Sequence, residues 1–127
     1  MMRGLSHQRA PGPEALLGRL KQSSEVEVGV TGRKTKRRIS APVWFVVDGR
    51  IVVLVPTKGS ESQWFKNLLK NPEVELRAGG VSVSAKASIV RDSMRTEKAV
   101  AELRAKYRSM WSESYYSKRD VCIEVAL

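Results

Sequence analysis

The chain has 127 residues, enough for one domain with its own hydrophobic core, and its 23 Lys and Arg outnumber 13 Asp and Glu to give a net charge of +10. That charge favours anionic partners: phosphorylated ligands, nucleic acid or acidic membranes. One histidine (His7), one cysteine (Cys122) and no long apolar run exclude a Ser-His-Asp triad, an internal disulfide, a His/Cys zinc site and a membrane span. We therefore expect a cytoplasmic protein that binds no metal and takes any redox chemistry from a cofactor.

The predicted elements begin after a polar N-terminal tail. Residues 1–12 are polar and lead into a Pro-Gly-Pro stretch over residues 11–13, which predicts a flexible tail ahead of a single domain over residues 13–127. Pro13 suits the first position of a short helix. The alternation of Val26, Val28 and Val30 with polar residues or glycine predicts a strand. Further strands are predicted over 39–47, 51–55, 73–78, 81–90 and 120–126, and helices from Ser60 and from Asp92 or Ser93.

The turns between these strands predict how they pair. Asp48-Gly49 and Gly79-Gly80 are typical of tight hairpins, so neighbouring strands should be antiparallel. Gln63, three residues after Ser60, is typical of a capping box at a helix start. The sequence thus predicts a mainly β protein with flanking helices, in which six mostly antiparallel strands form a small closed or half-closed barrel.

A basic turn between two strands is the first candidate binding element. Five of the six residues from Arg33 to Arg38 are basic, and Gly32 lets a ligand approach the backbone closely. The guanidinium groups of Arg33 and Arg38, the Lys34 ammonium and the Thr35 hydroxyl suit a phosphate or carboxylate. A solvated basic hairpin and a nucleic-acid contact are the alternatives, but no aromatic residue is interleaved with the cations, which disfavours nucleic acid.

A second candidate element joins an apolar strand to a helix. Pro56 to Ser60 precede the helix, whose free backbone N–H groups could bind an anion. Thr57 and Lys58 add donors, and Gly59 would let a flat ring lie against the backbone. Trp64 and Asn67 lie one helical turn apart and share a face. An ordinary capped turn, with Trp64 packed in the core, is the alternative.

The order of several motifs resembles that of a known family. These motifs are Gly32-Arg33-Lys34-Thr35, Arg38, Pro42-Val43-Trp44-Phe45, Asp48-Gly49, Thr57-Lys58-Gly59, Trp64, Asn67-Leu68 and Asn71-Pro72-Glu73-Val74. Across residues 25–90 they resemble the deazaflavin (coenzyme F420)-dependent nitroreductase and quinone reductase family, within the flavin-reductase-like split β-barrels. The resemblance implies a six-stranded, FMN-binding split-barrel-like fold, a homodimer, and F420 as hydride donor.

The resemblance also implies roles for individual residues. Arg33, Lys34 and Arg38 resemble ligands of the coenzyme's phosphate and polyglutamate tail, and the Thr57–Gly59 segment resembles the one that lies against its ring. The predicted cofactor-binding residues are Gly32, Arg33, Lys34, Thr35, Arg38, Pro56, Thr57, Lys58, Gly59, Trp64 and Asn67. The predicted substrate-pocket residues are Trp44, Tyr107, Tyr115 and Tyr116. The family usually has glycine where this chain has Lys36, and often also at Ser60, with a longer loop before Trp64.

The predicted function is transfer of a hydride from reduced F420 to a quinone, enone or nitroaromatic. The proton would come from solvent or from Tyr107, Tyr115 or Tyr116, and no catalytic residue is assigned. An FMN-dependent split-barrel reductase or oxidase and a non-catalytic cofactor-binding protein are the alternatives. A nucleic-acid-binding module is the least favoured.

Overall fold

The computed structural model describes residues 12–127, so the tail predicted over residues 1–12 lies outside the described residues except for Gly12. Within that range the helices are α1 (Pro13–Leu20), α2 (Gln63–Lys70) and α3 (Ser93–Lys106). The strands are β1 (Val26–Thr31), β2 (Arg38–Val43), β3 (Val46–Asp48), β4 (Ile51–Leu54), β5 (Glu73–Ala78), β6 (Val81–Val90) and β7 (Cys122–Ala126).

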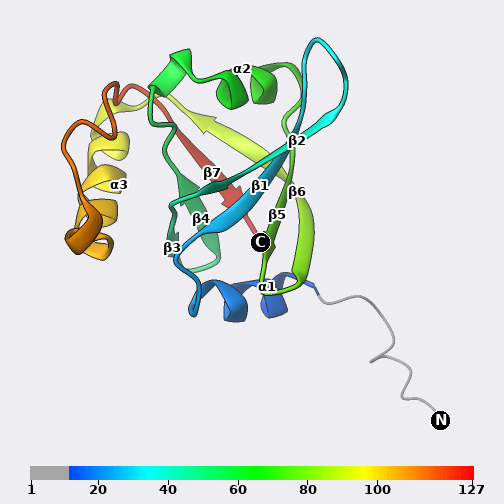
Figure 1. Cartoon of the computed structure of the whole chain (residues 1–127), viewed down its shortest axis with the longest axis horizontal. Coiled ribbons are helices and arrows are strands. Elements are labelled where there is room, and N and C mark those ends of the chain that lie inside the picture. The colour runs from blue at the N-terminus through cyan, green and yellow to red at the C-terminus, as the bar shows by residue number, and fades with distance from the viewer. Residues whose placement is uncertain (1–11) are drawn as a thin grey trace.

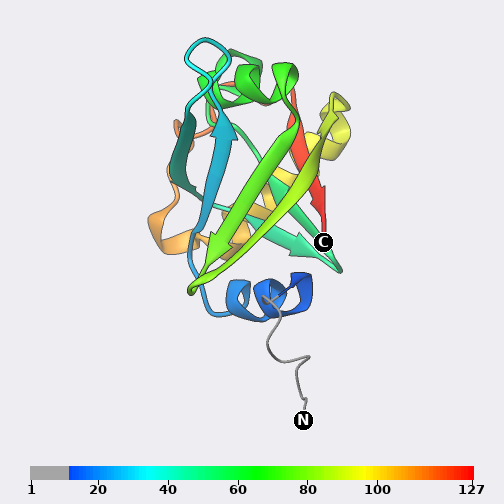
Figure 2. The same ribbon diagram turned by 90° about the vertical axis from the view of Figure 1, so that its right-hand side faces the viewer.

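The strands form one strongly curved antiparallel sheet in the order β2-β1-β5-β6-β7-β4-β3. The curvature is carried by the long strand β6, which pairs with β5 over Val81–Lys86 and with β7 over Ala87–Val90. Helix α1 lies across one end of the sheet, α2 across the other, and α3 along one side (Figures 1 and 2). The predicted class, a mainly β split barrel with flanking helices, is confirmed.

The sheet has seven strands instead of the predicted six because the run over 39–47 divides into β2 and β3. Trp44 and Phe45 leave the ladder between them. Strands β2 and β3 are the two edges of the sheet, so the chain crosses at these two residues from one edge to the other. The edges are not hydrogen-bonded to each other, and the barrel is therefore split.

The helix predicted from Ser60 begins later than expected. A 3-10 turn covers Gly59–Glu61, and α2 starts at Gln63 with Ser62 as its N-cap residue. The predicted capping box is wrong: the Ser60 hydroxyl donates instead to the Asp120 carboxylate over 2.5 Å. By contrast, α3 begins as predicted, because the Asp92 carboxylate accepts a hydrogen bond from the Met94 backbone N–H over 2.9 Å.

Two clusters of buried apolar residues hold the helices to the sheet. Leu16 and Leu20 of α1 and Phe65 and Leu68 of α2 are all at most 1% exposed and close the two ends of the barrel. On the outer side of β3 and β4, the second cluster includes Leu103 and other apolar residues of α3. No helix within residues 12–127 is both long enough and apolar enough to cross a membrane.

The crossing at Trp44 and Phe45 is fastened from α3 and the residue that follows it. The Tyr107 hydroxyl accepts from the Phe45 backbone N–H over 3.2 Å and donates to the Ser24 carbonyl over 2.9 Å. Its ring stacks on Trp44 with 4.3 Å between the centroids. The Lys106 ammonium donates to the Phe45 carbonyl over 2.8 Å and lies 3.4 Å from the centre of the Phe45 ring. Partial burial of this ammonium lowers the pKa of Lys106 to about 8.

The lowered pKa of Lys106 predicts a pH-dependent contribution to stability. Between about pH 8 and the unfolded value of 10.5, the unfolded chain binds the proton and the folded chain does not, so stability must rise with pH. We expect the unfolding free energy of the wild type, minus that of Lys106→Met, to increase as the pH rises from 7 to 10. Urea denaturation at each pH measures the difference, and a constant or shrinking difference would contradict the expectation.

Candidate active site

A groove of about 440 Å³ lies where the chain crosses between the sheet edges. Its walls come from the end of β2, the segment before α2, α2 itself and the segment over 110–116. The lining residues are Glu25, Ala41, Pro42, Val43, Trp44, Val55, Thr57, Trp64, Met110, Tyr115 and Tyr116. Most of these side chains are apolar or aromatic, so the groove suits a flat, weakly polar ligand.

Aromatic rings form one wall of the groove. Tyr115 meets Trp44 edge-on at 5.0 Å between centroids, and Tyr116 stacks on Trp111 at 5.4 Å. Tyr116 is only 3% exposed, and this burial raises the pKa of its hydroxyl above the ordinary tyrosine value. Trp44 is held by its stack on Tyr107, so packing within the protein positions this wall.

A second, smaller cavity of about 210 Å³ lies beneath the basic turn. Its lining residues are Gly32, Arg33, Lys34, Thr35, Ile39, Gln63 and Asn67. Two backbone hydrogen bonds close the turn, from Gly32 N to the Arg37 carbonyl over 2.8 Å and from Lys36 N to the Gly32 carbonyl over 2.9 Å. The turn is therefore an ordered hairpin loop.

Arg33 clamps the basic turn to helix α2. Its Nη1 donates to Asn67 Oδ1 over 2.8 Å and its Nη2 to Gln63 Oε1 over 2.7 Å. The Arg33 backbone N–H donates to the same Asn67 oxygen over 3.1 Å, and Asn67 is only 4% exposed. The same helix contributes Trp64 to the groove, so α2 bounds both cavities.

The basic turn carries positive charge that acidic side chains do not balance. Among the residues that the structure describes, Arg33, Lys34, Lys36 and Arg37 take part in no ion pair. Arg38 differs, because its Nη1 donates to the Gly29 carbonyl over 3.3 Å and lies 3.8 Å from Glu75. An anionic group at this cavity would meet the uncompensated cations of Arg33 and Lys34, which line it, with Lys36 and Arg37 on the same turn.

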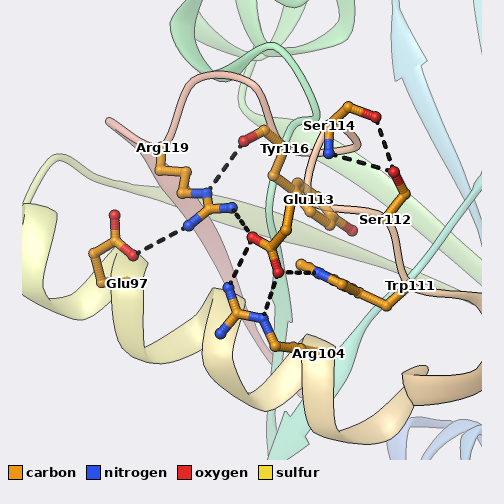
Figure 3. A network of polar contacts seen from close by, with 8 residues as sticks. All are labelled: Glu97, Arg104, Trp111, Ser112, Glu113, Ser114, Tyr116 and Arg119. Carbon is orange, nitrogen blue, oxygen red and sulfur yellow. Dashed lines mark hydrogen bonds and ion pairs between the residues drawn. The ribbon is translucent and has the colours of Figure 1, made fainter.

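Glu113 fastens the segment that carries the aromatic wall (Figure 3). Its carboxylate accepts from Arg104 Nε over 3.1 Å, from Trp111 Nε1 over 2.8 Å and from Arg119 Nη2 over 3.1 Å. The hydrogen bond from Arg104, followed by those from Trp111 and Arg119, lowers the pKa of Glu113 to about 2. Arg119 also donates to the Tyr116 carbonyl over 3.1 Å, which ties the network to the groove.

The same segment continues onto the turn before α2. The Ser117 backbone N–H donates to the Thr57 carbonyl over 3.0 Å, and Asp120 accepts from the Ser60 backbone N–H over 3.0 Å. Gly59 has a φ of +56°, and a Cβ there would overlap the Asp120 carboxylate and the Lys118 carbonyl. Glycine is thus required at this position by the chain packed against it.

Comparison with known families identifies the chain. The model of the family described as F420H(2)-dependent quinone reductase matches residues 7–127. The chain belongs to this family. It is an F420-dependent reductase, and coenzyme F420 is its cofactor. A search of curated proteins finds no match.

Solved structures share the fold of the reductase at low identity. An F420 reductase is 22% identical with a TM-score of 0.65, covering 89% of this chain and 90% of its own. An F420-H2 dependent reductase is 17% identical with a TM-score of 0.61, covering 92% and 97%. A pyridoxamine 5'-phosphate oxidase-like protein from Listeria innocua is 15% identical with a TM-score of 0.66, covering 90% and 91%.

The predicted site residues of the reductase fall into three groups: those at the basic cavity, those at the groove, and those at neither. Those that line the basic cavity are Gly32, Arg33, Lys34, Thr35 and Asn67. Those that line the groove are Trp44, Thr57, Trp64, Tyr115 and Tyr116. Those that line neither are Arg38, Pro56, Lys58, Gly59 and Tyr107. Of this last group, Arg38 turns toward Glu75 and Tyr107 lies behind Trp44.

Sequence reasoning missed several residues that line the two cavities. Gln63 could have been found, because it lies one turn before Asn67 on the same face of α2. Val55, Glu25 and Met110 line the groove, and no motif marks them, since they come together only when the barrel closes. Glu113 was missed for the same reason, because its partners lie on α3 and on both sides of it in the loop.

Lys36 is the only described non-glycine residue with a positive φ, at 63°. This conformation costs a residue with a Cβ about 1–2 kcal/mol. Glycine avoids that cost, but its greater freedom in the unfolded chain offsets part of the stabilisation. We expect Lys36→Gly to raise the unfolding free energy by about 0.5–1 kcal/mol in chemical denaturation. Lys34→Gly removes the same charge from the same turn without relieving strain, and equal stabilities of the two variants would contradict the explanation.

The Glu113 network predicts an acid-dependent contribution to stability. A carboxyl whose folded pKa is about 2 stabilises the fold fully above the unfolded value of 4.5 and loses that contribution as the pH falls toward 2. The advantage of wild type over Glu113→Gln should therefore be constant above pH 5 and shrink between pH 4.5 and 2. Glu102→Gln is the control, because Glu102 forms no ion pair among the described residues. A pH-independent advantage would count against the network.

Proposed function

We propose that the reductase binds the acidic tail of F420 at the basic cavity and its ring in the groove, and that a neutral, electron-poor acceptor shares that groove. The acceptor class is a quinone, an enone or a nitroaromatic. The observation that carries the proposal is that one helix, α2, bounds both cavities. A ligand with an anionic end and a flat end can then contact both cavities at once.

The chemistry of the donor set fits the coenzyme's tail. F420 carries a phosphate and glutamate carboxylates, and the turn offers four cations without acidic partners in the described part of the chain. Arg33 is held in place by Gln63 and Asn67, so part of its guanidinium serves to position the turn. Lys34, Lys36 and Arg37 are exposed and remain available to an anion. Each charge-assisted hydrogen bond contributes about 1.5–3 kcal/mol.

The groove would orient the acceptor against the coenzyme ring and exclude water from the reacting atoms. When bound, reduced F420 supplies the hydride. The flat faces of Trp44 and Trp64 and the apolar side chains of Val55 and Met110 would hold an aromatic acceptor near the ring site. Orientation of this kind lowers the barrier by removing translational and rotational freedom before the reaction.

Of the three tyrosines, Tyr115 and Tyr116 are placed to hydrogen-bond to the acceptor. The Tyr107 hydroxyl is already engaged by Phe45 and Ser24, so it serves the fold. Tyr115 and Tyr116 both line the groove, and within residues 12–127 neither hydroxyl takes part in a hydrogen bond. We expect one of these two hydroxyls to donate a hydrogen bond to the acceptor oxygen, and the proton that completes the reduction to come from solvent at the open side of the groove.

Two expectations from the sequence stay predictions. The first is a homodimer: the edge strand β2 is exposed along nearly its whole length, with Ile39 46% exposed, and so offers a free edge to a partner. The second is a cytoplasmic location, for which the sequence evidence is the single cysteine.

Titration of the protein with oxidised F420 tests the binding site. We expect Lys34→Gln/Lys36→Gln to weaken F420 binding about tenfold or more, because each lost cation costs on the order of 1 kcal/mol. The deazaflavin chromophore without its phosphate and glutamates should bind both proteins equally. Ligand fluorescence is the measurement.

Lys21→Gln/Lys98→Gln is the matched control, because it removes two exposed cations that lie outside the basic turn and both cavities. Equal loss in the control would show that net charge, and not the basic turn, binds the tail. Saturable binding of FMN in place of F420 would overturn the assignment of the ring site.

A further inference from the structure

The groove contains one charged side chain, the carboxylate of Glu25. Every other lining residue of the groove is apolar or neutral, and no lysine or arginine lines it. The chain as a whole has 23 basic and 13 acidic residues, so cations dominate its charge. The groove thus differs in sign from the rest of the molecule, and the difference rests on Glu25.

Glu25 is held beside the aromatic wall by its neighbours in the chain. Val26 pairs with Val43 at the end of the β1–β2 ladder, which places Glu25 at the level of Trp44. The preceding carbonyl, of Ser24, accepts a hydrogen bond from Tyr107, whose ring stacks on Trp44. The backbone on both sides of Glu25 is therefore fixed to the same structure that positions the wall.

The charge of Glu25 is not neutralised by the protein. Within residues 12–127 its carboxylate takes part in no ion pair and no hydrogen bond. Glu27, two residues along β1, shows the contrast: its carboxylate lies 3.7 Å from Arg77, and it does not line the groove. A ligand in the groove would meet an unpaired negative charge at Glu25.

The two cavities are therefore oppositely charged. Strand β1 separates Glu25 from the basic turn, and its six residues span about 20 Å at ~3.3 Å per residue. The basic turn lies at one end of the strand. Glu25 lies at the other end, where the nearby carboxylate of Glu27 is paired with Arg77. An acceptor that carries its own anionic group would be repelled at the end where it must bind.

We propose that Glu25 is a specificity-determining residue that excludes acceptors with a carboxylate or sulfonate and admits neutral or cationic ones. The inference rests on the proposed function, since it concerns the acceptor in the same groove. A unit charge at a few ångströms near a protein surface changes affinity by on the order of tenfold. The effect should weaken as salt screens the charge.

The test compares 1,4-naphthoquinone with 1,4-naphthoquinone-2-sulfonate as acceptors for the F420-loaded enzyme. We expect Glu25→Gln to raise kcat/KM for the sulfonate about tenfold and to leave the neutral quinone within about twofold. Glu25→Lys should raise the sulfonate value further, and 0.5 M NaCl should reduce the gain. Glu27→Gln is the matched control and should change neither value. Equal changes for both acceptors, or the same gain from Glu27→Gln, would overturn the role of Glu25.

A binding measurement separates this inference from the proposed function. Calorimetry with the redox-inert compounds 2-naphthalenesulfonate and 2-naphthol, in the presence of oxidised F420, needs no turnover. Glu25→Gln should tighten binding of the sulfonate about tenfold and leave 2-naphthol unchanged. Unchanged sulfonate affinity would overturn the inference even if quinones are reduced. Tighter binding of the sulfonate by Glu25→Gln, without reduction of any quinone, would support the inference about Glu25 and overturn the proposed acceptor class.

Discussion

The two edge strands of the sheet, β2 and β3, are connected by the chain at Trp44 and Phe45 but are not hydrogen-bonded to each other. The site depends on this constraint. The chain leaves β2 at Trp44 and re-enters the sheet after Phe45, so the barrel keeps an opening at that point. An open edge normally exposes unpaired backbone groups. Here the Phe45 N–H and carbonyl are bonded by Tyr107 and Lys106, which lets the opening persist. The groove is this opening, lined by side chains from the strands and segments around it.

Helix α2 converts one opening into a site with two chemically different ends. The clamp of Arg33 on Gln63 and Asn67 uses one guanidinium of the turn to hold the turn against the helix. The cations that remain, Lys34, Lys36 and Arg37, are long exposed side chains, suited to a long acidic tail whose carboxylates have no fixed geometry. Trp64 on the same helix borders the apolar groove. The distance between the charged end and the flat end of a ligand is thereby set by one rigid element.

Local patterns in the sequence determined the fold more fully than they determined the site. Alternation and tight turns predicted nearly every strand, because a strand's period and its hairpin turns are local. The crossing at Trp44 and Phe45 was missed, since both residues suit a strand and only their contacts with α3 show the break. Likewise, Ser60 has the local pattern of a helix cap, but its partner, Asp120, lies 60 residues away.

The residues of the site divide in the same way. Those in the basic turn could be predicted because the cations are contiguous and their chemistry is recognisable without the fold. Glu25 could not, because a single glutamate beside a strand is ordinary in sequence. It gains meaning only from the absence of other charges around it in the groove, which no local pattern records.

Two positions near the predicted ligand-binding segments are set by the backbone itself. Lys36 adopts a left-handed conformation at a position where the family usually has glycine. The hydrogen bonds of the turn require that conformation whichever residue is present. Gly59 has a positive φ and lies under Asp120 and Lys118, which leaves no room for a Cβ. The glycine positions in such motifs therefore reflect backbone conformation as well as contact with the ligand. The evidence for an anion at the basic turn is the unpaired charge of its cations, and it does not depend on the glycine pattern.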